Sequence, residues 1–185
     1  MSVGGPLSVA PATVADAPAL LALQRRVLEE RVWFITDPDE LRDTVETKAR
    51  SIRELAGGDD GVCLVARRGE RLVGTGSVSF LPRRKLRHVG RVELMVEPEE
   101  RRRGVGRALL RGLITWAERH PRVRKLSLQV FAHNEGAIAL YRSMGFVEEG
   151  RREDEYLFPD GSYRGDVLMA RPVARGPSLL ESEAG

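Results

Sequence analysis

Ten residues say more about the architecture of this chain than any other stretch: Arg101-Arg102-Arg103-Gly104-Val105-Gly106-Arg107-Ala108-Leu109-Leu110. They lie between a strand-like apolar run, residues 92–96, and a helix-like pattern over residues 104–118. Two glycines one residue apart at a helix start let backbone N–H groups converge on an anion. The arginines and the positive end of the helix dipole favour the same kind of ligand. This stretch therefore predicts a site for a diphosphate.

Other phosphate-binding motifs fit the stretch poorly. A P-loop needs Gly-Lys followed by Ser or Thr, whereas Arg107 and Ala108 follow the second glycine here. The dinucleotide motif G-x-G-x-x-G would need a glycine at Leu109. A plain glycine-rich turn into an amphipathic helix with a solvated basic face explains the ten residues equally well. The choice between the two interpretations needs more of the sequence.

A second stretch, residues 126–146, has the pattern of a strand, a capped short helix and a closing glycine. Together the two stretches resemble the GCN5-related N-acetyltransferases, the GNAT superfamily. The family's motif A, [Arg/Gln]-x-x-Gly-x-[Gly/Ala], is matched by Arg101, Gly104 and Gly106. Its motif B, N-x-x-A-x-x-x-Y-x-x-x-G-F, is matched by Asn134, Ala137, Tyr141, Gly145 and Phe146. The resemblance is strongest over residues 89–169 and weaker over residues 7–81.

The composition is that of a globular protein. With 185 residues, we expect a single domain over residues 1–172 and a loose tail over residues 173–185. The net charge of +3 comes from 30 basic and 27 acidic residues, and only 5% of residues are aromatic. That balance argues against a nucleic-acid-binding module. The single cysteine, Cys63, excludes a disulfide framework and a cysteine metal cluster, and no metal is expected.

The sequence also bears on location and partners. No apolar run is long enough to span a membrane, and the first six residues lack the basic and apolar regions of a signal peptide. We therefore expect a cytoplasmic protein without a membrane partner. A homodimer is one assembly that the sequence leaves open.

Apolar periodicity and turn residues predict an α/β fold (α+β in some schemes) of the GNAT type. The expected sheet is mixed, mostly antiparallel, with about seven strands flanked by about four helices. Strands are expected at residues 7–11, 62–67, 72–81, 89–96, 125–131, 147–158 and 162–169. Helices are expected after a cap at residues 13–16, from residue 38 or 39 to about 55 before Gly57 and Gly58, and at residues 104–118 and 134–144.

The resemblance implies acetyl-CoA as the acetyl donor. Its diphosphate would meet backbone N–H groups of residues 102–107, and its pantetheine would lie along residues 94–96 like an added strand. A backbone N–H near Met95 or Val96 would polarise the thioester carbonyl, and a splay between strands 89–96 and 125–131 would open the cleft. The implied coenzyme-binding residues are Leu94, Met95, Val96, Arg101, Arg102, Arg103, Gly104, Val105, Gly106, Arg107, Asn134 and Tyr141.

Two residues are candidates for catalysis. Tyr141 would protonate the departing thiolate, because a phenol with a pKa near 10 keeps its proton at neutral pH. The alternative is that Tyr141 is a core aromatic at helical spacing.

Some relatives have a glutamate base where this chain has Gln129, which cannot accept a proton. Glu93 is the substitute, acting through a water. It could instead be an exposed carboxylate paired with Arg91 or Lys125.

The expected function is therefore an N-acetyltransferase acting on a primary amine by direct attack in a ternary complex. The acceptor would be an amino acid, a small amine or a protein N-terminus. Carboxylates expected at the cleft mouth are Glu30, Glu40, Asp154, Glu155, Asp160 and Asp166. The alternative is a non-catalytic, regulatory acyl-CoA-binding protein of the same fold, which Gln129 would permit.

Overall fold

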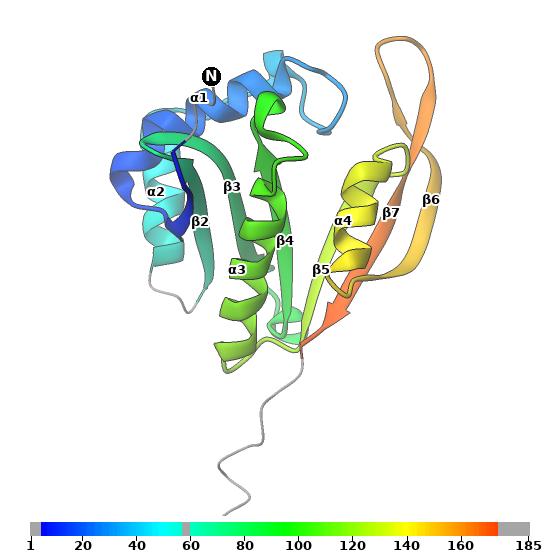
Figure 1. Cartoon of the computed structure of the whole chain (residues 1–185). Coiled ribbons are helices and arrows are strands. Elements are labelled where there is room, and N and C mark those ends of the chain that lie inside the picture. Colours follow the sequence, from blue (N-terminus) through cyan, green and yellow to red (C-terminus); the bar gives the residue numbers. More distant parts are fainter. Residues whose placement is uncertain (1–4, 57–59, 174–185) are drawn as a thin grey trace, which may run out of the picture.

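The computed structural model describes residues 5–56 and 60–173. Its strands are β1 (Leu7–Pro11), β2 (Gly61–Arg68), β3 (Arg71–Phe80), β4 (Val89–Val96), β5 (Lys125–Phe131), β6 (Val147–Leu157) and β7 (Tyr163–Pro172). Its α-helices are α1 (Ala17–Leu28), α2 (Val45–Ala56), α3 (Val105–Arg119) and α4 (Glu135–Ser143) (Figure 1). The expected order of elements and the α/β GNAT fold are confirmed. Gly57, Gly58 and the predicted tail beyond Val173 lie outside the described residues.

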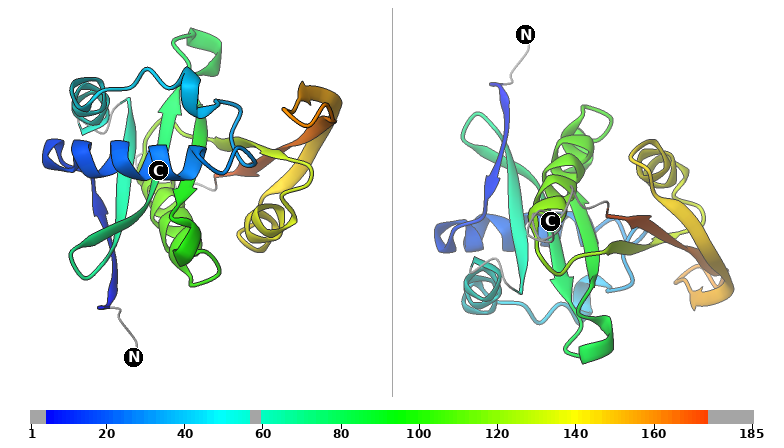
Figure 2. Two further views of the ribbon diagram at one scale, coloured as in Figure 1. Left: turned by 90° about the horizontal axis from the view of Figure 1, so that it is seen from above. Right: turned by 90° about the horizontal axis from the view of Figure 1, so that it is seen from below.

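One sheet contains all the described strands, in the order β1-β2-β3-β4-β5-β7-β6. All neighbouring strands are antiparallel except β4 and β5, which are parallel. Helices α1 and α2 lie on one face of the sheet, and α3 and α4 lie on the other (Figure 2). The sheet is thus the middle of three layers, and its parallel pair is at its centre.

Two apolar clusters join these layers. In β2 the side chain of Val65 packs with α1 and α2, whereas its neighbours Leu64 and Ala66 pack with α3, as strand alternation requires. Helix α3 packs on the sheet through buried apolar residues that include Leu110, Ile114 and Ala117, whereas Ala108, Gly112 and Trp116 are partly exposed.

The second helix begins later than predicted. Residues Pro38–Glu40 form one 3-10 turn, closed by a capping box in which Glu40 accepts from the Asp37 N–H at 2.9 Å. The backbone of Leu41 is extended, which ends that turn. Thr44 and Thr47 then exchange hydrogen bonds between side chain and backbone at 2.9 and 3.3 Å, and α2 starts at Val45, directly after Thr44. Local side-chain bonds therefore divide a segment that looked continuous in the sequence.

The final hairpin is longer and less regular than predicted. Strand β7 continues to Pro172, three residues past the expected end at Met169. The pairing of β6 with β7 shifts register twice, between Glu148 and Gly150 and between Arg152 and Tyr156. Asp154, inside the second shift, has φ +51°, a left-handed conformation that Asp tolerates better than most residues. The two register shifts let this hairpin bend.

Candidate active site

The central parallel pair is open at one end. Strands β4 and β5 pair only through Val89–Arg91 and Lys125–Ser127, and then diverge toward the top of Figure 1. This confirms the predicted splay. The gap leads into a cleft of about 1380 Å³, lined by the ends of β4 and β5, the start of α3, one side of α4 and the segment after α1. Pockets for one small ligand usually measure about 300–1,000 Å³, so this cleft has room for two substrates.

The loop before α3 turns its backbone N–H groups toward the cleft entrance. Arg102 has φ +63° and Gly104, the N-cap of α3, has φ +84°. Left-handed residues alternating with ordinary ones gather successive N–H groups into an anion-binding concavity. The first intrahelical bond runs from the Ala108 N–H to the Gly104 carbonyl, so the preceding N–H groups of the first turn have no helical acceptor. The loop therefore offers free donors and the positive end of α3.

The two glycines of this loop serve different purposes. A Cβ on Gly104 would meet no atom within 4 Å, so glycine is favoured there by the left-handed backbone alone. A Cβ on Gly106 would lie 3.1 Å from Cδ2 of Leu140 on α4. Gly106 therefore permits the close approach of α3 to α4 beside the cleft.

The four predicted arginines do not share one role. Arg101, Arg102 and Arg107 line the cleft, whereas Arg103 lies outside it and its guanidinium is 3.8 Å from Glu100. Arg101 is bound by both carboxylate oxygens of Glu30 and donates to the Val96 carbonyl at 3.3 Å. Val105 does not line the cleft, because its side chain is buried in the α3 core. Only its backbone N–H is available to a ligand.

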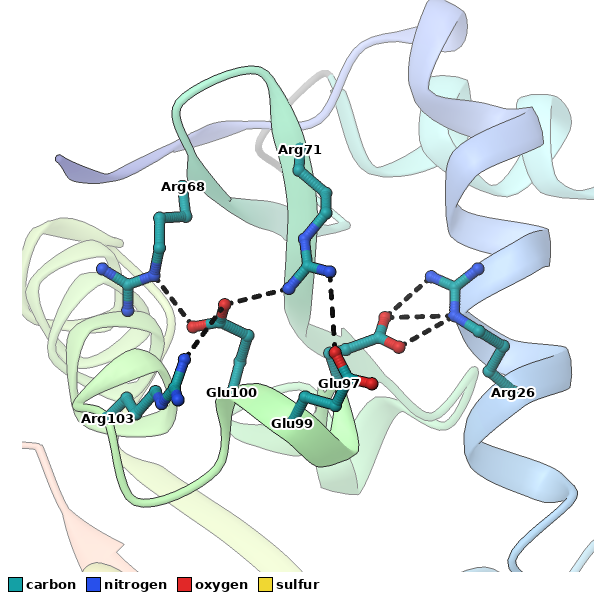
Figure 3. Close-up of polar contacts among 7 residues, drawn as sticks. All are labelled: Arg26, Arg68, Arg71, Glu97, Glu99, Glu100 and Arg103. Atoms are coloured by element: carbon teal, nitrogen blue, oxygen red, sulfur yellow. Dashed lines mark hydrogen bonds and ion pairs between the residues drawn. The ribbon is translucent and has the colours of Figure 1, made fainter. Parts of the chain in front are cut away.

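Two buried carboxylates anchor this loop to the rest of the protein (Figure 3). Glu97 precedes the 3-10 turn η4 (Pro98–Glu100), which connects β4 to the loop, and Glu100 ends it. Glu97, 7% exposed, is held by Arg26 of α1 through bonds of 2.7 and 2.9 Å. Glu100, 3% exposed, accepts from Arg68 at 2.8 Å and Arg71 at 2.9 Å. Sequence reasoning missed both residues, since acidic residues after a strand usually lie in solvent.

Burial and pairing act in opposite directions on Glu100. Burial alone would raise the pKa of its carboxyl, but the hydrogen bonds from Arg68 and Arg71 and the charge of Arg103 outweigh it. The pKa of Glu100 therefore lies below its ordinary value, and the carboxylate stays charged at neutral pH.

The end of β4 offers backbone groups to the gap. Leu94, Met95 and Val96 all line the cleft. The Glu97 N–H bonds to the Val73 carbonyl, so Glu97 and Val73 form a hydrogen-bonded pair of the antiparallel ladder. Since such pairs alternate, Met95 directs its N–H toward β3, whereas Val96 and Leu94 direct theirs into the gap. Of the two predicted donors for a thioester carbonyl, the register therefore favours Val96.

Helix α4 presents both of its predicted residues to the cleft. Asn134 is its N-cap and accepts from the Ala137 N–H at 3.1 Å, so the capping interpretation is confirmed while the side chain still lines the cleft. Tyr141 is 8% exposed, packs on Phe146 with ring centroids 5.8 Å apart, and also lines the cleft. Burial raises the pKa of Tyr141 to about 12. Its hydroxyl is therefore protonated at neutral pH.

On the β5 side, Gln129 belongs to a polar network. Its amide donates to Asp166 at 3.3 Å, and Asp166 is also bound by Arg152, through Nε at 2.9 Å and through Nη2, and by the Tyr156 hydroxyl at 2.9 Å. Burial would raise the pKa of Asp166, but these bonds lower it. Of the six carboxylates expected at the mouth, only Asp166 lines the cleft, and its charge is already matched by Arg152.

Glu93 is the other carboxylate that bears on catalysis. It is exposed and lines the cleft, and no hydrogen bond or ion pair joins it to any residue in the described part of the chain. The alternative pairing with Lys125 does not occur, because Lys125 binds Glu149 at 2.6 Å.

Cys63 also lines the cleft, but burial raises the pKa of its thiol, which favours a structural role.

An aromatic cluster that the sequence did not predict lies beside the cleft. His133 stacks on Trp33 and Phe131, with ring centroids 5.5 and 5.4 Å apart, and its Nε2 lies 3.3 Å from the Val32 carbonyl oxygen. Burial lowers the pKa of His133. The cluster joins the segment after α1 to the turn before α4, so it connects the two walls of the cleft.

No group of residues suited to a metal ion occurs among the described residues.

The comparisons with known proteins give the family to which this chain belongs. The family model described as Acetyltransferase (GNAT) family matches residues 25–146. This chain belongs to the GNAT family of acetyltransferases. Among curated proteins, none matches the sequence significantly.

Three solved structures have the same fold. A GNAT acetyltransferase from Streptococcus pneumoniae is 27% identical, with a TM-score of 0.87 over 91% of this chain and 100% of that one. A ribosomal-protein-alanine N-acetyltransferase from Brucella melitensis is 29% identical, with a TM-score of 0.78 over 89% and 99%. A putative acetyltransferase from Salmonella typhimurium, solved with its cofactor acetyl-CoA, is 16% identical, with a TM-score of 0.83 over 93% and 96%. The third likeness bears on the fold alone. Within the described residues, no helix is long and apolar enough to cross a membrane.

Proposed function

We propose that this protein is an N-acetyltransferase that moves the acetyl group of acetyl-CoA to a primary amine in a ternary complex. The observation that supports this function most is the gap between β4 and β5, which opens directly beside the donor-rich start of α3. A long, thin ligand with an anionic head fits such a site. Membership of the GNAT family of acetyltransferases supports an acetyl donor.

The coenzyme would be held mainly by backbone groups. The N–H groups of the residue 102–107 loop and the charge of Arg102 would bind the diphosphate. The edge of β4 at Leu94 and Val96 would pair with the pantetheine amides, and the Val96 N–H would donate to the thioester oxygen as negative charge develops on it. Asn134 lines the same side of the cleft.

The chemical step needs two proton transfers. A neutral amine attacks the thioester carbonyl carbon, the C–N bond forms, and the C–S bond then breaks. Tyr141, with its pKa raised by burial, would give its proton to the departing thiolate sulfur and regain one from solvent. The amine loses its extra proton to water, and Glu93, unpaired within the described chain, would take part as a relay through that water.

The name of the Brucella neighbour specifies an alanine in a ribosomal protein as its acceptor, which supports an amine acceptor for this chain as well.

The second candidate is a non-catalytic acyl-CoA-binding protein. One observation favours it: Gln129 stands at the position where some relatives have a glutamate base, and its amide is occupied by Asp166. Thiol release separates the two candidates. The enzyme should release CoA from acetyl-CoA only when an amine is added, with acetylated amine formed in equal amount. Binding of acetyl-CoA without turnover across amino acids, polyamines and peptides would favour the second candidate.

A further inference from the structure

The charged side chains that line the cleft fall into two groups. Six of them are bound within the protein: Lys48 to Asp43, Arg101 to Glu30, Arg107 to Ser143, Glu149 to Lys125, and Arg152 and Asp166 to each other. Three others, Arg91, Glu93 and Arg102, form no hydrogen bond or ion pair with any residue of 5–56 and 60–173. Arg102 belongs to the loop proposed for the diphosphate. Arg91 and Glu93 are therefore the charges left for the second substrate.

These two residues lie on the face of the sheet away from the coenzyme loop. In the β3–β4 ladder, Gly76 is opposite Leu94, and a Cβ on Gly76 would contact Leu94 and Leu113 of α3. Met95, next in β4, packs instead with the cluster of α1 and α2. Because side chains alternate along a strand, Glu93 and Arg91 share the face of Met95. The coenzyme loop and the unpaired charges thus belong to opposite faces of the sheet, and both line the cleft.

The position of the two charges along β4 suits a reacting group. Arg91 is the last residue of β4 paired with β5, opposite Ser127, and Glu93 lies two residues further on, where the strands have separated. The register puts Ser79 beside Arg91 and Ser77 beside Glu93, so their cross-strand neighbours are small and polar. Residues two apart in a strand are about 6.5–7 Å apart at Cα. A small ligand with one cationic and one anionic group can bridge that distance between two long side chains.

We propose that Arg91 and Glu93 together select a zwitterionic acceptor, a free α-amino acid. Glu93 would bind the ammonium group that becomes the reacting amine, and Arg91 would hold the carboxylate with two parallel N–H bonds. This inference rests on the proposed function and names its acceptor class. A peptide N-terminus has a neutral amide in place of that carboxylate, so it would leave Arg91 without a counter-charge.

Equilibrium binding tests this selection without relying on turnover. The proteinogenic amino acids and their carboxamides are titrated by calorimetry into the protein, alone and with CoA, at a pH of about 6.5, where both ammonium groups are charged. We expect at least one acid to bind about 10- to 100-fold more tightly than its own carboxamide, the range for a hydrogen bond to a charged group. If no acid binds more tightly than its carboxamide, the proposal is wrong.

Variants of two arginines complete the test. Arg91→Met should reduce the acid-to-amide ratio to about one, and Arg91→Lys should restore part of it, since the charge returns without the planar fork. Arg111→Met is the matched control, because Arg111 is exposed on α3 and does not line the cleft; it should keep the wild-type ratio. A ratio that survives in Arg91→Met at unchanged melting temperature overturns the assignment of Arg91.

The proposed function and the zwitterion site would fail in different ways. Acetylation of carboxamides or peptides without any preference for acids would retain the acetyltransferase and remove the zwitterion site. Binding of acids that depends on Arg91, with no acetylated product, would retain the site and remove the proposed function.

Discussion

At the scale of single residues, burial gives Tyr141 the properties of a proton donor. Its ring is packed against Phe146 and its pKa is raised to about 12, so the protonated form persists well above neutral pH. The same burial is typical of a core aromatic. The two interpretations of Tyr141 differ only in what the hydroxyl does, and a variant that keeps the ring separates them.

Tyr141→Phe should lower kcat by about 10²–10⁴-fold, the usual effect of losing a general acid, while acetyl-CoA affinity changes little. Because the pKa is about 12, the phenol does not titrate near neutral pH, and the wild-type rate should show no alkaline decline from this group below about pH 10. Single-turnover rates across that pH range provide the measurement. Full activity in a step limited by chemistry would leave Tyr141 as a packing residue.

Gly106 provides a second prediction at this scale. Gly106→Glu brings a side chain to within 3.1 Å of Leu140 and a negative charge to the loop proposed for the diphosphate. Acetyl-CoA affinity should fall by more than about 10-fold, since an anion at this helix start repels another anion. Gly150→Glu is the matched control, because a Cβ on Gly150 in β6 meets no atom within 4 Å. Equal affinity of the two variants, measured by calorimetry, would contradict the diphosphate assignment.

At the scale of elements, the coenzyme loop is positioned by ion pairs from distant parts of the chain. Glu97 is tied to α1, and Glu100 is tied to the β2–β3 turn through Arg68 and Arg71 (Figure 3). A loop fixed in this way loses little further conformational freedom when it binds a ligand. The buried carboxylates therefore affect both the stability of the fold and the affinity of the loop.

Glu100→Gln removes the charge that three arginines share and should destabilise the protein by on the order of 2 kcal/mol, because the arginines themselves are partly exposed. Acetyl-CoA affinity should fall with it. Glu99→Gln is the control: the neighbouring carboxylate is 79% exposed and 3.9 Å from Arg71, so its loss should change little. Urea unfolding and calorimetry provide the two measurements. Unchanged coenzyme affinity in Glu100→Gln would show that the loop does not need this anchor.

The low pKa of Glu100 also fixes the pH dependence of its contribution. A carboxyl whose pKa is lowered by folding adds stability above its unfolded pKa, near 4.3, and loses it as the pH falls through the folded value. The stability difference between wild type and Glu100→Gln should therefore shrink as the pH is lowered below about 4.

The elements also show why sequence reasoning succeeded in some places and failed in others. Strands β4 and β5 and the cap at Asn134 were predicted to within a residue, because alternation and capping are local signals. The start of α2 was missed, since a short-range exchange between Thr44 and Thr47 outweighed the helical periodicity before it. The ion pairs of Glu97 and Glu100 join residues about 30 to 70 positions apart, and no single-sequence pattern specifies them.

At the scale of the whole molecule, the divergence of β4 and β5 divides the sheet into two parts that share one cleft. The coenzyme loop belongs to the part with α1 and α2, whereas Gln129, Asp166 and the final hairpin belong to the other part. Resemblance located coenzyme residues in both parts from their motifs. It could not specify the pairing of Asp166 with Arg152, which are cross-strand partners between two register shifts of an irregular hairpin.

This arrangement predicts which amines react. Gln129 cannot accept a proton and Asp166 is occupied, so within the described chain Glu93 is the unpaired carboxylate that lines the cleft, and we expect it to relay the amine proton to water. An α-amine is less basic than a lysine ε-amine, whose pKa is near 10.4, so a larger fraction of an α-amine is neutral at a given pH. The enzyme should therefore prefer α-amines to ε-amines.

Two isomers of acetyl-lysine test this preference. They have the same mass and both keep the α-carboxylate, so they differ only in which amine is free. Nε-acetyl-lysine presents only its α-amine, and Nα-acetyl-lysine presents only its ε-amine. We expect kcat/KM at about pH 7.5 to be at least 10-fold higher for the first, because a larger fraction of its amine is neutral. Glu93→Gln should lower kcat for the α-amine, since the relay for the proton is lost. Preference for the ε-amine would remove the acceptor assignment, and an unaltered kcat in Glu93→Gln would remove the relay.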